Sequence, residues 1–199
     1  MKKPAPHLQL VEPPRAATGH PASLAEHTDD DLMRLARAGS RPAFETLVRR
    51  HQARVLAVAA RRLGHPAFAA DVAQNTFLAI YGALASYQAR GRFTSFLYQV
   101  LLNQCRMHQR AARVEARALG SVAEEPRLLE HDVLAREWQR DVESALARLS
   151  DKLRDVVVLR FNGGLGYEEI AETLKVPVGT VKRRLFDGLA KMRDGMERP

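Results

Sequence analysis

Apolar residues recur every three or four positions through most of this chain, and that spacing constrains the fold more than any other feature. Phe44, Leu47, Val55 and Val58 follow it in the first half of the sequence. This period is typical of amphipathic helices, and glycine and proline breaks such as 64–66 divide the pattern into separate segments. No convincing strand pattern and no internal repeat interrupts it. The sequence therefore predicts an all-α fold.

Charge and composition divide the chain into four segments. Segment 26–117 has 14 Lys/Arg against 7 Asp/Glu, whereas 118–144 has 3 against 7 and 145–199 has 11 against 8. Two basic blocks around an acidic connector suggest two small helical domains that face a polyanion and are joined by a flexible acidic linker. We expect a mobile tail at 1–25, a first domain at 26–117, a linker at 118–135 and a second domain at 136–199.

The net charge of +8 and the sequence pI near 10.1 suit a nucleic-acid partner, although a merely soluble basic surface would explain them too. Cys105 is the only cysteine, which excludes an intrachain disulfide and fits a reduced, cytoplasmic setting. The first residues lack the apolar run of a signal peptide, and no stretch is long enough to span a membrane. No cluster with metal-ligand spacing is present, so we expect neither a metal nor a cofactor.

The strongest local signal is YEEIAETLKVPVGTVKRRL, at 167–185. Ile170, Ala171 and Leu174 give its first helix an inward face, and a Val-Pro-Val-Gly turn follows. The second helix has an apolar seam at spacings of four, four and three, which consists of Val181, Leu185, Leu189 and Met192. The outward residues are Thr180, Lys182, Arg183 and Arg184. This pattern predicts a helix-turn-helix whose second helix enters the major groove of DNA, with a plain helical hairpin as the alternative.

A second signal lies on the helix expected from about Phe93 to Arg117. One face carries a stripe at spacings of three and four, formed by Asn103, Arg106, Arg110, Arg113 and Arg117. Such arginines can track a phosphate backbone, and Asn103 could reach a base edge. The alternative is a solvated charged face. No acidic residue stands at i±4 along the stripe to neutralise it within its own helix.

Two further segments are weaker signals on their own. The turn 86–93 interleaves Tyr87, Arg90, Arg92 and Phe93, a mixture that suits unstacked single-stranded DNA but also a loop closed by core aromatics. The preceding helix, expected from about Asp71 to Ala85, has two apolar seams and polar residues at its start. Such a helix is either buried twice, once against a partner, or is a simple core helix.

These segments together resemble a known family. The stretch 71–110 is similar to the second conserved region of extracytoplasmic-function sigma factors, and 149–193 is similar to their fourth region. With a weaker match from Asp29 to Gly64, the resemblance covers nearly all of 29–194, in the family's order. It implies an all-α, non-enzymatic protein that binds core RNA polymerase and recognises promoters.

The resemblance also implies roles for individual residues. Asp71, Gln74 and Asn75 fall where the family contacts the clamp helices of the polymerase β′ subunit, although the usual acidic residue is missing at Asn75. Tyr87, Arg90 and Arg92 fall in the loop that captures a flipped base of the −10 element, and Asn103, Arg106, Arg110 and Arg113 on the −10 recognition helix. Met107 and Phe96 replace the Asp and Trp that are common there. Thr180, Lys182, Arg183 and Arg184 would read the −35 element.

The partners implied are core RNA polymerase, promoter DNA and an anti-sigma factor, which in this family is often membrane-bound; no small-molecule substrate is expected. A stand-alone helix-turn-helix regulator is the first alternative. A nucleic-acid-processing enzyme is the second, but it would need clustered carboxylates for metal ions. The acidic residues of 26–117 cluster only at Asp29–Asp31, and no catalytic set is visible.

Overall fold

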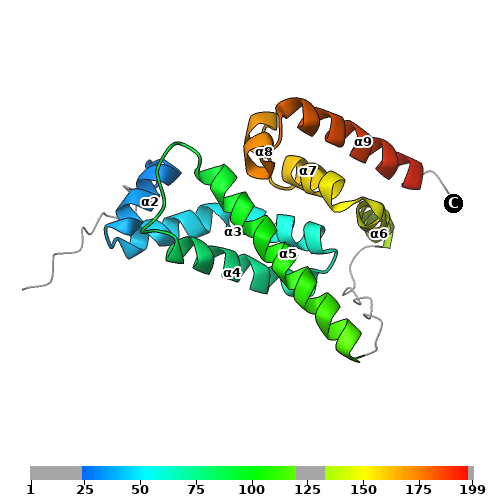
Figure 1. Ribbon diagram of the computed structural model, residues 1–199, viewed down its shortest axis with the longest axis horizontal. Coiled ribbons are helices and arrows are strands. Elements are labelled where there is room, and N and C mark those ends of the chain that lie inside the picture. Colours follow the sequence, from blue (N-terminus) through cyan, green and yellow to red (C-terminus); the bar gives the residue numbers. More distant parts are fainter. Residues whose placement is uncertain (1–23, 120–132, 197–199) are drawn as a thin grey trace, which may run out of the picture.

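The computed structural model describes residues 24–119 and 133–196, and the side chains of 116–119 and 133–139 lie outside that description. The described residues form helices and connecting turns without any strand, which confirms the all-α prediction. They are arranged as an N-terminal group, α2 to α5, and a C-terminal group, α6 to α9 (Figure 1). None of the described helices is both long and apolar enough to cross a bilayer.

The N-terminal domain consists of α2 (Asp29–Arg37), α3 (Arg41–Leu63), the 3-10 turn η1 (Pro66–Phe68), α4 (Ala69–Gly82) and α5 (Phe93–Leu119). Helix α3 packs against α2, α4 and α5, so the core lies around it. Its buried face includes Leu47, Val55, Val58 and Ala59, which keep the helical spacing expected from the sequence.

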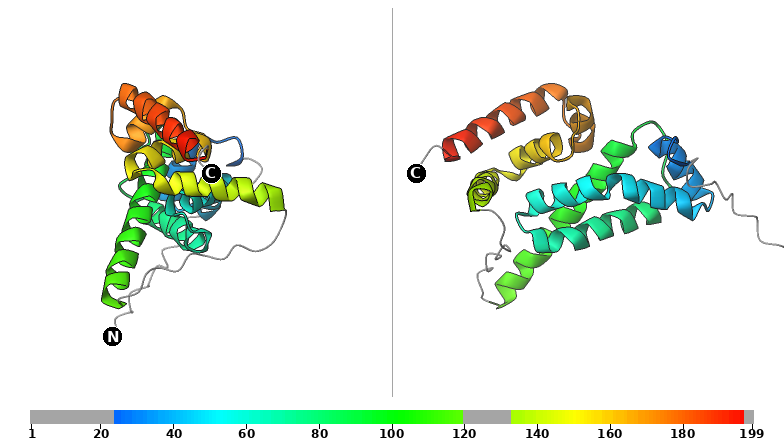
Figure 2. Two further views of the ribbon diagram at one scale, coloured as in Figure 1. Left: turned by 90° about the vertical axis from the view of Figure 1, so that its right-hand side faces the viewer. Right: turned by 180° about the vertical axis from the view of Figure 1, so that it is seen from behind.

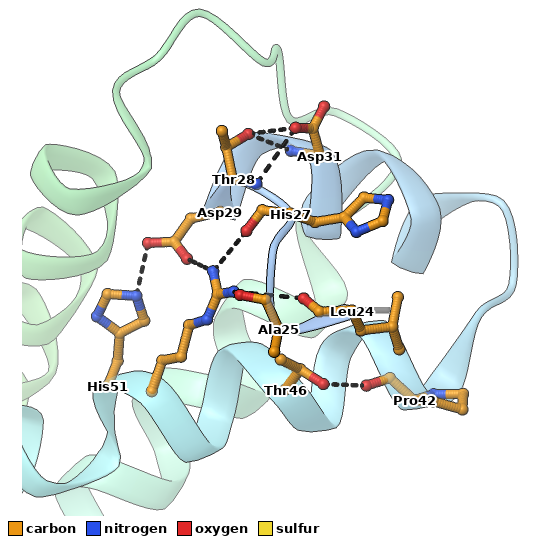
Figure 3. A network of polar contacts seen from close by, with 10 residues as sticks. Leu24, Ala25, His27, Thr28, Asp29, Asp31, Pro42, Thr46 and His51 are labelled. Atoms are coloured by element: carbon orange, nitrogen blue, oxygen red, sulfur yellow. Dashed lines mark hydrogen bonds and ion pairs between the residues drawn. The ribbon is translucent and has the colours of Figure 1, made fainter. Parts of the chain in front are cut away.

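The start of the domain is fastened to α3 by polar contacts. Thr28 caps α2, because its Oγ1 accepts a hydrogen bond from the Asp31 amide at 3.2 Å and the Asp31 carboxylate accepts one from the Thr28 amide. The Arg50 guanidinium donates to the His27 carbonyl and to Asp29 Oδ1, both at 2.8 Å, and His51 Nε2 lies 2.7 Å from Asp29 Oδ2 (Figure 3). Burial alone would raise the pKa of Asp29, but the hydrogen bonds from His51 and Arg50 outweigh it and lower that pKa.

The C-terminal domain consists of α6 (Val133–Arg148), α7 (Asp151–Phe161), α8 (Tyr167–Leu174) and α9 (Val178–Met196). Ser150 occupies the N-cap position of α7, and Arg154 closes the end of α6. That guanidinium donates to the carbonyls of Leu146, Ala147 and Leu149 at 2.6 to 2.9 Å, so it satisfies groups that a helix end leaves without partners.

Two details of the helix-turn-helix differ from expectation. Val181 and Leu185 are buried as predicted, but Leu189 is 40% exposed, and Gly188 takes the contact with α7. A Cβ at Gly188 would lie 2.9 Å from Val157 Cγ2, so the glycine allows the two helices to approach closely. The turn between α8 and α9 is made by Lys175 in the left-handed region, with φ 54° and ψ 49°, and Gly179 lies inside α9.

The two domains lie against each other. Helix α7 contacts α3, and α8 contacts the first half of α5, so the C-terminal domain covers one flank of the N-terminal domain (Figures 1 and 2). Helix α5 continues to Leu119 and α6 begins at Val133, while 120–132, inside the expected linker, lie outside the described residues. The domain boundaries inferred from composition stay predictions.

Candidate functional surfaces

An open apolar groove of about 750 Å³ lies between α3 and α4. Three of its large side chains are unusually exposed, with Leu78 at 59%, Tyr81 at 57% and Leu56 at 45%. The Phe44 and Tyr81 rings meet edge to face across it, with centroids 5.0 Å apart. The remaining lining residues are Val48, Gln52, Ala53, Ala70, Ala73, Gln74 and Phe77. An apolar patch of this kind on a small domain is typical of a protein-docking surface.

The three residues expected to bind a protein partner stand beside this groove. Asp71, Gln74 and Asn75 are all exposed on α4, and Gln74 is part of the lining. The spacing of apolar residues predicted that Tyr81 and Phe77 share one apolar face, but Phe77 is largely buried and Tyr81 stands in the groove. The sequence did not identify the groove residues of α3, because the sequence of α3 alone does not show which part of its surface α4 covers.

The loop between α4 and α5 encloses a second, smaller pocket of about 300 Å³, lined by Ala83, Ser86, Tyr87, Gln88, Arg90, Arg92 and Phe96. The Tyr87 hydroxyl donates to Asp30 Oδ1 at 2.7 Å, and its ring lies 5.1 Å from that of Phe96. Burial and the neighbouring carboxylate raise the pKa of Tyr87, which therefore stays a neutral donor. Phe93 is buried, so for this residue the core alternative is correct. Arg90 and Arg92 are exposed at the mouth.

The predicted stripe on α5 is only partly free. Asn103, Arg110 and Arg113 are exposed, whereas the side chain of Arg117 lies outside the described residues. Arg106 donates to Asn103 Oδ1 at 3.2 Å and to Asp155 Oδ2 of α7 at 3.1 Å. The sequence offered the stripe no acidic partner within its own helix, and the structure supplies one from the other domain.

Asp155 is the centre of a charged contact between the domains, which we call the seam. The Arg62 side chain of α3 is fully buried, and its Nε lies 2.5 Å from Asp155 Oδ1. Gln109 of α5 accepts a further hydrogen bond from Arg62 at 3.2 Å. Arg62 Nη2 approaches Asp151 at 3.2 Å as an ion pair, although the orientation does not make a hydrogen bond.

Sequence reasoning missed the seam, although one signal was present. Arg62 follows Val55, Val58 and Ala59 at the spacing of the buried face of α3. A charged residue at such a position predicts a buried acidic partner. The spacing cannot tell which carboxylate it is, because Asp155 is 93 positions away.

The basic residues of α9 project from the helix-turn-helix. Lys182 and Arg183 are exposed, while Thr180 and Arg184 are half-buried on the flanks. Lys182 Nζ lies 5.6 Å from the centre of the Tyr167 ring, and Arg183 Nε is 3.9 Å from Asp187, too far for a strong ion pair. This arrangement leaves the N-terminal part of α9 able to meet an anionic surface. Within the described ranges, no group of His, Cys, Asp and Glu side chains could hold a metal ion.

Comparison with known proteins assigns two segments of the chain to one family. The family model "Sigma-70 region 2" matches residues 47–114, and "Sigma-70, region 4" matches 145–194. The RNA polymerase sigma-H factor of Pseudomonas aeruginosa is 29% identical over 175 residues, which cover 82% of this chain and 91% of that protein. The ECF RNA polymerase sigma-E factor of Escherichia coli K12 is 30% identical over 171 residues, covering 80% and 89%.

A solved structure is also similar. CnrH, in complex with the cytosolic domain of CnrY, is 28% identical to this chain, with a TM-score of 0.65. The match covers 83% of this chain and 95% of CnrH.

Proposed function

This chain belongs to the extracytoplasmic-function class of the sigma-70 family, and we propose that its groove, loop and helix-turn-helix divide the work of promoter-directed transcription among them. As a sigma factor, it binds core RNA polymerase and directs it to promoters. The exposed apolar groove supports this division of roles. It lies on the same domain as the arginine stripe, yet its lining has no basic residue.

The groove binds the polymerase. Leu56, Leu78 and Tyr81 present apolar surface that a helical partner would bury, and Asp71, Gln74 and Asn75 stand at its edge for polar contacts. Burying one large side chain stabilises a complex by about 1.5–3 kcal/mol. The clamp helices of the β′ subunit are the partner that the family resemblance indicates.

The loop and α5 recognise the −10 element. The pocket around Tyr87 and Phe96 offers aromatic surface, and Arg90 and Arg92 at its mouth can bind the backbone of a flipped nucleotide. Asn103, Arg106, Arg110 and Arg113 would continue this contact along α5. Stacking a base on an aromatic side chain contributes about 1–3 kcal/mol.

The second helix of the helix-turn-helix recognises the −35 element. Val181 and Leu185 bury one face of α9, which leaves Lys182 and Arg183 on the opposite side. Thr180 and Arg184 flank them. An arginine can bind the edge of a guanine and a lysine can neutralise a phosphate, so the helix has both kinds of contact available.

The remaining assignments follow from this role. The N-terminal domain at 26–117 and the C-terminal domain at 136–199 act as separate DNA-reading units, and the chain has no catalytic activity of its own. Its place of action is the cytoplasm, where the polymerase is. An anti-sigma factor is a further partner, supported by the similarity to CnrH, which was solved with the cytosolic domain of CnrY.

The test is a pull-down with core RNA polymerase followed by run-off transcription from candidate promoters. We expect a stable holoenzyme and transcripts that depend on both the chain and the promoter sequence. A stand-alone helix-turn-helix regulator would instead bind duplex DNA without the polymerase and give no transcript from core enzyme. That outcome would overturn the proposed function.

A further inference from the structure

We propose that Met107 is a specificity-determining residue of α5, and that it selects thymine by contact with the 5-methyl group of that base. The inference rests on the proposed function, because it names the base preference of the same DNA-binding surface. It starts from one observation. Met107 is a large apolar side chain, yet it is 60% exposed in the middle of a cationic helix face.

Met107 lies on the outermost line of α5. Successive residues of an α-helix are about 100° apart, so Asn103, Met107 and Arg110 fall within an arc of about 60°. All three are exposed, whereas Leu101 and Cys105 on the opposite side are buried in the core. The helix therefore presents an amide, a thioether and a guanidinium in one row to whatever lies against it.

The place of Met107 in this row determines what it can meet. At about 1.5 Å per residue, Asn103 and Arg110 are about 10 Å apart along the helix, or about three stacked base steps of about 3.4 Å. Met107 stands between them, about one turn from each. A DNA strand that reaches both Asn103 and Arg110, as the proposed function requires, therefore also covers Met107.

A methionine side chain gains from DNA through apolar contact. Its thioether is only a weak acceptor, and it has no charge with which to bind a phosphate. The 5-methyl group of thymine is an apolar group on the base edge that side chains of a helix reach. Adenine, guanine and cytosine present polar groups on that edge, and an apolar side chain would leave those groups without a hydrogen-bond partner. Met107 therefore favours thymine and disfavours the other three bases.

The surroundings of Met107 agree with this preference. Recognition of cytosine through its amino group would need a carboxylate in the row, but Asn103 and Ala111, one turn to either side, are uncharged. Arg106, one position earlier, is paired with Asp155 of α7 at 3.1 Å, and Met107 still has most of its surface exposed. The flexible, unbranched side chain can also follow a base that moves as the strands separate.

The experiment uses the holoenzyme, assembled from core polymerase and the full chain. Its ligand is a fragment of a promoter that gives a transcript in the run-off test, with a single-stranded −10 segment. Each position of the non-template strand in that segment carries dT, dU or dC in turn, and the affinity of the holoenzyme is measured for each fragment. Because dU differs from dT only by the missing 5-methyl group, the dT/dU ratio isolates the contribution of that group.

In the parent we expect one position at which dT binds about fourfold more tightly than dU, as the burial of one methyl-sized group predicts. Met107→Ala should abolish this preference and leave the other positions unchanged. Met107→Leu keeps a large apolar side chain and should keep the preference. Met107→Asp should prefer dC over dT at the same position, because a carboxylate accepts a hydrogen bond from the cytosine amino group.

A matched control separates the base contact from the added charge. Val114→Asp places a carboxylate at a similarly exposed site of α5, about one turn beyond Arg110. This carboxylate should weaken binding of every fragment, because it repels the phosphates. It should not change the dT/dU ratio at the position that responds to Met107.

Two results would overturn the inference: a parent without a dT/dU difference at any position, or a difference that persists in full in Met107→Ala. Circular dichroism should show parental helicity in Met107→Ala and Met107→Leu, because the side chain is exposed and both new residues favour helices. If no promoter-dependent transcript forms, the proposed function fails and the inference fails with it. Transcripts together with an unaltered dT/dU ratio in Met107→Ala would overturn the inference alone.

Discussion

The groove between α3 and α4 and the stripe on α5 lie on one small domain. They differ in chemistry and in their contacts with the other domain. The groove is apolar and open, with Leu78 and Tyr81 more than half exposed. The stripe is cationic, and Arg106 within it is held by Asp155 of the other domain. Each surface is suited to a different partner, and only the stripe has a residue that is paired with the other domain.

This difference predicts that the two surfaces fail in different ways. An added charge disrupts an apolar docking surface, whereas the loss of a cation weakens a surface that binds phosphates. The predictions below alter one surface at a time, beginning with the largest expected effect.

The groove should be sensitive to charge. Leu78→Asp places a carboxylate in the apolar surface that we propose binds the polymerase, so we expect core binding to weaken about a hundredfold, or about 2.7 kcal/mol. Helicity should not change, since Leu78 is exposed in the free chain. Affinity is measured with labelled protein and core polymerase without DNA. Val114→Asp, at an equally exposed site on α5, is the control and should bind normally. Parental affinity of Leu78→Asp would show that the groove is not the polymerase site.

The −10 loop should affect strand opening rather than assembly. Arg90→Ala and Tyr87→Ala each remove a group from the 300 Å³ pocket, and we expect about tenfold less open complex in each case, at 1–3 kcal/mol per stacked base. Permanganate reactivity of unpaired thymines measures it. Tyr87→Phe is the control, because it keeps the ring and loses only the hydrogen bond to Asp30. A permanganate pattern in Tyr87→Ala like that of the parent would rule out base capture there.

The surface of α9 is also cationic, and because Lys182 and Arg183 are exposed, their variants should act on DNA binding directly. Arg183→Ala should relax base preference at one −35 position at a cost of about 1–3 kcal/mol. Lys182→Ala should weaken all promoters alike and flatten the salt dependence. The measurement is transcription from single-base −35 variants at two salt concentrations. If neither promoter choice nor activity changes in either variant, α9 does not read this element.

The smallest effect concerns the turn that orients α9. Lys175 adopts a left-handed conformation that costs a side-chain-bearing residue about 1–2 kcal/mol, so Lys175→Gly should stabilise the chain by about 0.5 kcal/mol after the entropy of the unfolded state is included. Thermal unfolding measures this change. Lys175→Ala removes the same charge but keeps the strain. Equal melting temperatures of the two variants would contradict the explanation.

Local patterns were enough to predict the helices and most of their buried faces. Val181 and Leu185 were correctly placed on the buried face of α9. The prediction that Leu189 is buried was wrong. Gly188 lets α7 approach so closely that this glycine, and not Leu189, makes the contact. The spacing of hydrophobic residues shows which side chains are large and apolar, but it does not show where the backbones of two helices come close together.

The surfaces themselves were harder to predict than the helices. Asp71, Gln74 and Asn75 were predicted through the family resemblance, but Leu56 and Leu78 of the groove were not, because their exposure depends on how α3 and α4 pack. The ion pair of Arg62 and Asp155 joins residues that are distant in sequence and belong to different domains. Tertiary structure alone brings such groups together.

The most direct test of the contrast alters one surface at a time and measures both partners. Leu78→Asp in the groove should weaken binding of core polymerase about a hundredfold. Arg110→Ala combined with Arg113→Ala on the exposed stripe should keep the parent's affinity for the polymerase, and its holoenzyme should form open complexes about tenfold more slowly. Loss of polymerase binding in the arginine variant, or parental polymerase binding in Leu78→Asp, would contradict the account.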